Sequence, residues 1–204
     1  LQIADIAREN PNINILSDEI YELILKKEFK HNSISTLAND LKDRIFIING
    51  FAKGWAMTGW RIGYLVGPKD VIKASSALQS QSTSNVCSFV QKGALEALKI
   101  NNEFFSMINS HYDQRRSLLY EGLKNINGIY IEEPNGAFYA FPRLPNALIT
   151  SVDFCNKALQ DYGLVVVPGK AFGADECIRI SCAASEIKIK DGLNRLEKAI
   201  SEYY

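Results

Sequence analysis

Residues 50–63 read GFAKGWAMTGWRIG, and this stretch decides the fold and the chemistry that we expect. It follows RIFIIN (44–49), an apolar run of strand length, and leads into WRIGYLVG (60–67), a second expected strand. Lys53 lies between them among small and aromatic residues. An apolar setting favours the neutral amine, which is the nucleophile in Schiff-base chemistry. Lys53 is therefore a candidate catalytic residue, and the alternative is a solvated loop lysine.

The first half of the chain alternates strands with helices, which predicts an α/β fold with a mostly parallel sheet covered on both faces. One helix, at 86–99, places Val90, Ala94, Leu95 and Leu98 on a single apolar stripe. The expected strands are 13–16, 44–49 and 60–67, and the expected helices are 1–10, 36–43, 68–80 and 86–99.

The second half has a different texture and predicts a compact α+β unit. A long helical pattern over 103–125 ends at Asn127-Gly128, a helix-stop signal. We place the domain boundary inside this helix, which gives domains at 1–110 and 111–204. The elements expected after it are strands at 129–132, 137–141, 164–167 and 178–182, and helices at 153–162 and from 185 to the end.

Three polar side chains occur where strands of the first half begin or end. Asp18 follows the strand at 13–16, Lys53 follows the strand at 44–49, and Arg61 starts the next strand. In open α/β sheets, ligands bind at the carboxyl ends of the strands, so these groups could meet in one crevice. Each also has a structural alternative: a turn or helix cap for Asp18, a solvated charge for Lys53, and a surface ion pair for Arg61.

Composition excludes several classes of protein. The 204 residues carry 23 basic and 23 acidic side chains, so the basic excess of a nucleic-acid binder is absent. No apolar run approaches the roughly 18 residues of a membrane helix. The four cysteines and two histidines show no metal-ligand spacing, and we expect no metal site. The cysteines of FCNKAL and CIRISC are typical of small buried residues in a reducing cytoplasm.

With these features in place, the chain resembles the class I/II aminotransferases, which use pyridoxal phosphate. GFAKGWAMTGWRIG is similar to the lysine signature of that family, and SDEIYE (17–22) is similar to its Asp-x-x-Tyr element. EPNGAFYAFP (133–142), VVPGKAFG (166–173) and IRISCA (178–183) resemble its small-domain motifs, in the family's order. GWAMTGWRIGY and QSQSTSN look most like bacterial aspartate aminotransferases. The resemblance implies fold type I, with part of the parallel-sheet cofactor domain followed by the α+β small domain.

The resemblance also implies a role for each site residue. Lys53 would form the Schiff base with the cofactor and carry a proton between the substrate α-carbon and the cofactor. Asp18 would pair with the pyridine nitrogen, and Tyr21 would donate to the ring's phenolic oxygen. Arg61 would bind the cofactor phosphate, and Arg179 would bind the substrate α-carboxylate; without the resemblance, Arg179 is better explained as a strand-edge ion pair.

The implied function is amino transfer from L-aspartate or a related amino acid to 2-oxoglutarate, by a cytoplasmic homodimer. The chain begins inside a helical pattern without a cap, and the family's fold is about twice as long, so we expect a piece of a longer protein that is weak or inactive alone. Gly50 and Ala52 are departures that bring fewer hydroxyl groups to the phosphate, and Ser84 and Asn85 fall where the family's dimer contacts occur. Two alternatives stay open: a carbon–sulfur β-lyase on the same fold, and a non-enzymatic truncated homologue.

Overall fold

The computed structural model describes residues 2–145 and 149–204, so Leu1 of the predicted first helix lies outside the described residues. The chain forms two compact units, Leu1–Phe105 and Ser106–Tyr204, which divide within helix α5 (Asn102–Lys124). The first unit contains α1 (Gln2–Glu9), β1 (Ile15–Asp18), α2 (Ile34–Leu37), η1 (Asn39–Arg44), β2 (Ile45–Gly50), η2 (Thr58–Trp60), β3 (Gly63–Val66), α3 (Lys69–Ser82) and α4 (Ser88–Ala97).

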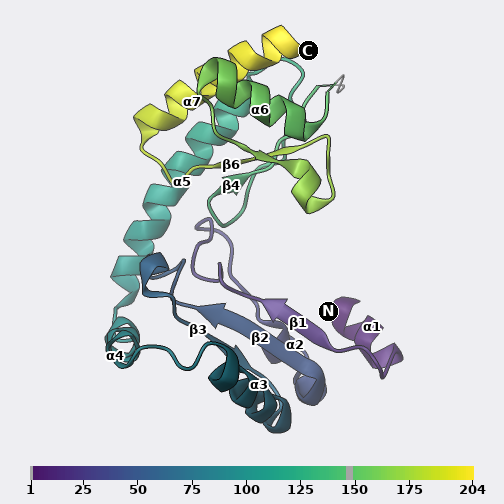
Figure 1. The fold of residues 1–204 in the computed structure, drawn as a ribbon, viewed down its shortest axis with the longest axis vertical. Helices are drawn as coiled ribbons and strands as arrows, with labels where there is room; N and C mark the ends of the chain where they lie inside the picture. Colours follow the sequence, from purple (N-terminus) through teal and green to yellow (C-terminus); the bar gives the residue numbers. More distant parts are fainter. Residues whose placement is uncertain (1, 146–148) are drawn as a thin grey trace. The chain divides into compact units, whose positions relative to one another are not determined.

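The first unit is built on a three-stranded sheet with the order β1-β2-β3 (Figure 1). β1 pairs with β2 in parallel, with Asp18 opposite Ile48. β3 pairs with β2 in antiparallel fashion, with Gly50 opposite Gly63. The sheet is therefore mixed rather than mostly parallel, because the chain returns from β2 to β3 through a loop and not through a crossover helix.

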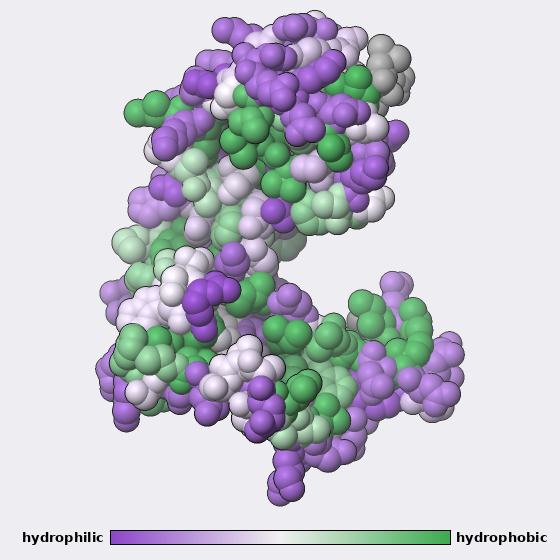
Figure 2. Space-filling view, viewed as in Figure 1, coloured by the Kyte–Doolittle hydropathy of each residue, from purple (hydrophilic) through white to green (hydrophobic). Residues whose placement is uncertain are grey.

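The two faces of this sheet are covered unequally. α1, α2 and η1 cover one face, where Ala4, Ala7 and Leu41 pack with Ile45 and Ile47 of β2. On the strands' other face, Leu16 is 65% exposed and Ile48 is 39% exposed. The expectation of a sheet covered on both faces is wrong for this structure, and Figure 2 shows hydrophobic side chains at the surface of this unit.

Two helices of the first unit differ from the sequence prediction. The predicted helix at 36–43 is split into α2 and η1, because Ala38 between them has a non-helical backbone (φ −134°). Leu95 of α4 and Leu98, just after its end, are exposed, while Val90, Ala94 and Ala97 are buried. The buried stripe of α4 is therefore made mainly of small residues, which lets the helix approach Phe51 closely.

The second unit is an antiparallel sheet with helices packed on it. Its strands are β4 (Tyr139–Ala140), β6 (Ile178–Ser181) and β5 (Val167–Pro168), in that order across the sheet. The helices α6 (Ser151–Tyr162) and α7 (Glu186–Tyr203) lie side by side (Figure 1). At 129–132 the chain makes an isolated bridge through Tyr130 to Arg143 and not the predicted strand. The short helix η3 (Gly169–Phe172) follows β5 directly.

One continuous core fills the second unit. Leu123 of α5, Phe154 of α6, Ile178 of β6 and Leu196 of α7 are at most 1% exposed. The ends of α6 follow the sequence: the Thr150 side chain accepts from the amide of Asp153, and Gly163 closes the helix in the left-handed conformation.

The cysteines divide between the two units. Cys155, Cys177 and Cys182 are buried in the second unit, as predicted, and Cys87 in the first unit is exposed. Burial raises the pKa of Cys182 to about 11. Among the described residues, no helix has the length and apolar character needed to cross a membrane.

Candidate active site

The parallel pairing of β1 and β2 places Asp18 and Lys53 at the same edge of the first sheet. Asp18 is the last residue of β1 and pairs with Ile48 near the end of β2. Lys53 lies in the loop that follows β2. The carboxyl ends of parallel strands share one edge, so the carboxylate and the amine start from neighbouring positions.

The chain coils directly after β1. The Glu19 amide donates to the Ile48 carbonyl (2.8 Å), and the Glu22 amide donates back to the Glu19 carbonyl (2.9 Å). Asp18 is exposed, and its Oδ1 accepts from the Ile20 amide at 3.3 Å. This turn brings Tyr21 back toward the end of β1, where its half-buried ring faces the loop after β2.

Lys53 lies in a tight turn that faces Tyr21. The Ala56 amide donates to the Lys53 carbonyl (3.1 Å), and the Met57 amide donates to the Phe51 carbonyl (3.2 Å). Lys53 is half-buried, and its Nζ lies 5.8 Å from the centroid of the Tyr21 ring. The structure thus brings together the amine and the phenol that the sequence predicts to share a site.

Aromatic packing supports the turn that carries Lys53. The Trp55 Nε1 donates to the Ala97 carbonyl of α4 (3.1 Å), and the Phe51 and Trp55 ring centroids are 4.8 Å apart. Phe51 is buried against Ala94 and Ala97. Phe51 and Trp55 lie on either side of Lys53 in the sequence, so their packing supports the loop backbone before and after the lysine.

Gly50 is required by the close approach of two strands. A Cβ at this position would lie 2.7 Å from the Gly63 Cα and 2.9 Å from the Ile62 carbonyl oxygen, both of them backbone atoms. No side chain fits there without moving β3. This explains the glycine at one of the two positions where the sequence departs from a hydroxyl-bearing family pattern.

The sequence suggested that Arg61 lies at the start of a strand, and the structure places it before the strand. It follows the short helix η2 with a left-handed backbone (φ 52°), and β3 begins at Gly63. Its side chain is exposed, and Nη1 donates to the Thr58 carbonyl (2.9 Å). The predicted strand at 60–67 contains β3, but its start was placed too early. The apolar residues of WRIG suggest extended chain, whereas Trp60 belongs to η2 and packs over Gly93, where a Cβ would lie 2.3 Å from the Trp60 ring.

Arg179 belongs to the second unit and is held between two aromatic rings. Its Cζ lies 4.5 Å from the centroid of Tyr139 and 4.7 Å from that of Phe172. Contact with the faces of aromatic rings uses the flat surface of a guanidinium, whereas its N–H donors lie in the guanidinium plane. This arrangement suits bidentate recognition of a carboxylate. The sequence did not single out Tyr139 or Phe172, although both lie within the quoted motifs.

The sequence also did not predict a polar cluster next to Asp18, in which Glu19 is buried and Glu22 and His31 are half-buried. Atoms of Glu19, Glu22 and His31 that could ligate a metal lie within 4.8 Å of one another. Hydrogen bonds from protein groups engage both carboxylates: His31 and Ser33 contact Glu19, and the Asn49 Nδ2 donates to Glu22 (2.6 Å). We therefore interpret the cluster as a hydrogen-bond network and assign it no metal.

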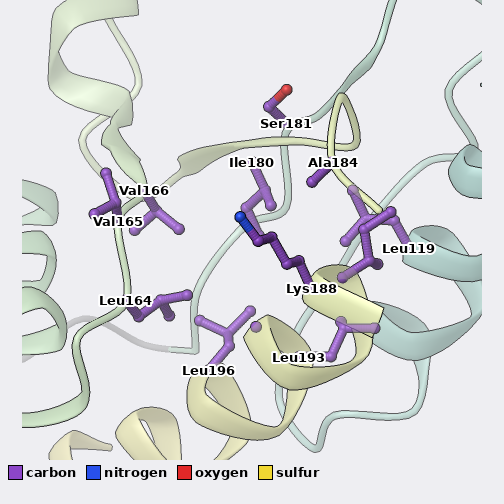
Figure 3. A pocket seen from close by; sticks show the side chains of 12 residues that line it. Leu119, Leu164, Val165, Val166, Ile180, Ser181, Ala184, Lys188, Leu193 and Leu196 are labelled. Carbon is purple, nitrogen blue, oxygen red and sulfur yellow. The ribbon is translucent and has the colours of Figure 1, made fainter. Parts of the chain in front are cut away.

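A separate apolar pocket of about 190 Å³ lies in the second unit. Figure 3 shows the Lys188 side chain extending across it, with its nitrogen beside Ile180. The pocket contains none of the predicted site residues. Its lining is Leu119, Leu164, Val165, Val166, Ile180, Ser181, Ala184, Lys188, Ile189, Gly192, Leu193 and Leu196.

Comparison with known sequences points to one family. The family model for aminotransferase class I and II matches residues 1–196. An aspartate aminotransferase of Pinus pinaster is 39% identical and is matched over 98% of this chain and 43% of that relative. An aspartate aminotransferase of Pyrococcus horikoshii is 40% identical, with 97% of this chain and 51% of that relative covered.

Comparison with solved structures gives the same fold. An aromatic aminotransferase from Pyrococcus horikoshii OT3 has a TM-score of 0.91 at 34% identity, with 98% of this chain and 54% of that chain covered. An aspartate aminotransferase from Rhizobium meliloti has a TM-score of 0.90 at 35% identity, with 98% and 52% covered. The chain spans about half the length of the relatives it matches, in their C-terminal part. The predicted α/β class and fold type I are confirmed. The chain belongs to the aminotransferase class I and II family.

Proposed function

We propose that this chain is part of a pyridoxal phosphate-dependent aminotransferase that moves an amino group from L-aspartate or a related L-amino acid to 2-oxoglutarate. The observation that carries the proposal is the Lys53 amine, 5.8 Å from the Tyr21 ring and at the same sheet edge as Asp18. The aspartate aminotransferases among the relatives support the choice of substrate. We further infer a cytoplasmic homodimer in which 1–110 belong to the cofactor domain and 111–204 form the small domain.

The residues of the first unit fit the cofactor in their chemistry. Pyridoxal phosphate presents an aldehyde, a basic ring nitrogen, a phenolic oxygen and a phosphate. The first unit supplies an amine at Lys53, a carboxylate at Asp18, a phenol at Tyr21 and a guanidinium at Arg61. Each of these groups is complementary to one feature of the cofactor.

When bound, the cofactor supplies an electron sink for the substrate α-carbon. Lys53 Nζ would hold the cofactor covalently until the amine of the substrate replaces it there. The released Lys53 amine would then move a proton between the α-carbon and the cofactor C4′ carbon. The Asp18 carboxylate would keep the pyridine nitrogen protonated, and the Tyr21 hydroxyl would donate to the phenolic oxygen. Arg61, whose Nη1 donates to the Thr58 carbonyl, would bind the phosphate through its guanidinium N–H groups. Arg179 would bind the α-carboxylate through its in-plane N–H groups.

We expect the 204-residue chain alone to transfer amino groups weakly or not at all, because it spans only about half of its relatives. The test is a single-turnover reaction of the purified chain with pyridoxal phosphate and excess L-aspartate, followed by mass spectrometry of the products. A slow yield of oxaloacetate that is lost in Lys53→Ala and kept in Lys99→Ala supports the proposal. Lys99 is a matched control because its exposed amine pairs with Glu96 on the surface.

Other products identify the alternative functions. Pyruvate and ammonia from a cysteine conjugate, without amino transfer, would identify a carbon–sulfur β-lyase. No cofactor attachment at Lys53, together with tight binding to an intact family subunit, would identify a non-enzymatic homologue. Robust transamination by the 204-residue chain would contradict the expected weakness.

A further inference from the structure

Glu19 is a buried acid that lies between two residues of the proposed site. Asp18 precedes it and Tyr21 follows it, yet Glu19 itself is only 5% exposed. Burying a carboxylate is costly unless hydrogen bonds replace the water that it loses. Its burial therefore calls for an explanation that the reaction does not supply.

Hydrogen bonds to both carboxylate oxygens provide that explanation. The Glu19 Oε2 contacts His31 Nε2 (3.0 Å), and its Oε1 accepts from the Ser33 hydroxyl (2.9 Å) and the Ser17 hydroxyl (3.1 Å). Burial raises the pKa of Glu19, but the hydrogen bonds from His31, Ser33 and Ser17 outweigh it, so the pKa lies below its ordinary value. An ionised carboxylate only accepts, so His31 Nε2 must carry the proton that it donates.

This network ties the site turn to a second segment of the chain. His31 and Ser33 lie in the connection that leads to α2, and the Glu19 amide is bonded to Ile48 of β2. Glu19 is thus fixed at its backbone and at its side chain. Asp18, by contrast, is exposed, and its Oδ1 contact is with the Ile20 amide in the same turn. The residue next to Asp18 is thus held at more points than Asp18 itself.

We propose that Glu19 is a positioning residue: its buried carboxylate, held by His31, Ser33 and Ser17, fixes the turn that presents Asp18 and Tyr21 to the cofactor. Glu19 touches neither substrate nor cofactor and acts through the turn. The inference rests on the proposed function for what Asp18 and Tyr21 bind. It deepens that function by assigning the rigidity of the site to a group outside it.

Amide hydrogen exchange tests the positioning without cofactor. In the full chain, Glu19→Ala is expected to speed exchange of the peptide 17–24 by about tenfold or more, as expected for losing hydrogen bonds to a charged group. Glu19→Gln keeps the shape and one acceptor, and is expected to restore most of the protection. Glu96→Gln, at an exposed glutamate of α4, is the matched control and leaves this peptide unchanged.

A core variant separates positioning from general destabilisation. Leu41→Ala removes a buried side chain from the same unit and lowers its stability. It is expected to leave exchange at 17–24 no faster than at other peptides of the first unit. If Glu19→Ala gives that same uniform pattern, or no change, the positioning role is wrong. Should Glu19→Ala fail to fold, Ser33→Ala replaces it, with a smaller selective increase expected.

Pyridoxal phosphate titration, followed by absorbance, then tests the link to the site. The dissociation constant is expected to rise about tenfold in Glu19→Ala and to stay near the wild-type value in Glu19→Gln and Leu41→Ala. Selective exchange with unchanged cofactor affinity would overturn the positioning role. Absence of cofactor binding by the wild-type chain would count against the proposed function, while the exchange result would still decide whether Glu19 fixes the turn.

Discussion

The two units of the chain differ in how their buried apolar residues are arranged. In Ser106–Tyr204, one core joins α5, α6, α7 and the antiparallel sheet. In Leu1–Phe105, the buried apolar residues form smaller separate clusters, one under β2 around Ile47 and one around Phe51. One face of the first sheet is left open at Leu16 and Ile48.

The unit with the smaller clusters carries most of the proposed chemistry. Asp18, Tyr21, Lys53 and Arg61 all belong to it, and only Arg179 belongs to the second unit. Polar contacts do much of the positioning there, through the turn after β1 and the network around Glu19. In the first unit, hydrogen bonds hold the turn after β1 and aromatic packing supports the loop with Lys53, whereas in the second unit one apolar core holds the elements together.

The largest expected effect is on the core of the second unit. Phe154 is fully buried, and Phe154→Ala should lower the free energy of unfolding by about 3–5 kcal/mol because it leaves a cavity. Phe89, which is 71% exposed in the first unit, is the matched control, and Phe89→Ala should change it by less than about 0.5 kcal/mol. Urea unfolding measures both, and equal losses would remove the contrast between the units.

The next effect concerns the one proposed site residue in the second unit. Arg179→Ala should raise the amino acid concentration for half-maximal single turnover by about tenfold or more, because the carboxylate loses its bidentate partner. Phe172→Ala should cause a smaller increase, since it removes one of the rings stacked on the guanidinium. Arg195→Ala, which breaks a surface pair with Asp191, is the control. An unchanged concentration in Arg179→Ala would assign that residue a structural role.

A pH series tests whether the ionised Glu19 carboxylate stabilises the first unit. The pKa of Glu19 is lowered on folding, so its stabilising contribution is present above its ordinary pKa of about 4.5 and is lost as the pH falls through the folded value. The free energy of unfolding of the wild-type chain, relative to that of Glu19→Gln, should therefore fall as the pH is lowered from 6 to 3. Urea midpoints measure it, and a pH-independent difference would show that the ionised carboxylate is not what matters.

The smallest change in stability is expected at the open sheet face. Leu16→Lys should alter the free energy of unfolding by less than about 0.5 kcal/mol, because Leu16 is already 65% exposed. It should, however, reduce concentration-dependent self-association, measured by sedimentation, because it breaks an exposed apolar patch. Ile187→Lys, at an 80% exposed isoleucine of the second unit, should have less effect on association. An equal effect of both variants would mean that the sheet face is not special.

Much of the fold was predictable because local signals agreed with the tertiary structure. The apolar runs before Lys53 and before Asp18 became β2 and β1, and the residues around α6 and α7 carry clear caps at Thr150 and Ser185. The direction of β3 was not predictable, because an apolar run has no signal for parallel or antiparallel pairing. The predicted lengths of β4 and β5 were too long, because an apolar run does not show where strand pairing begins or ends.

The sequence and the family resemblance named the residues of the candidate site, and their roles stay predictions. The hydrogen bonds that hold the turn after β1 were not predicted. The contact of Glu19 with His31 spans distant sequence positions, so periodicity offers no signal for it. Arg61 was placed in a strand because its left-handed backbone cannot be predicted from the sequence. Glycine usually marks such a conformation, and here the residue is an arginine within an apolar run.

The most direct test of the proposed site is to locate where pyridoxal phosphate attaches. The purified chain would be titrated with the cofactor, reduced with borohydride and mapped by peptide mass spectrometry, with Lys53→Ala in parallel. We expect a saturable absorbance band and a label on the peptide containing Lys53, with both lost in the variant. A label scattered over surface lysines, or an unchanged band in Lys53→Ala, would contradict it.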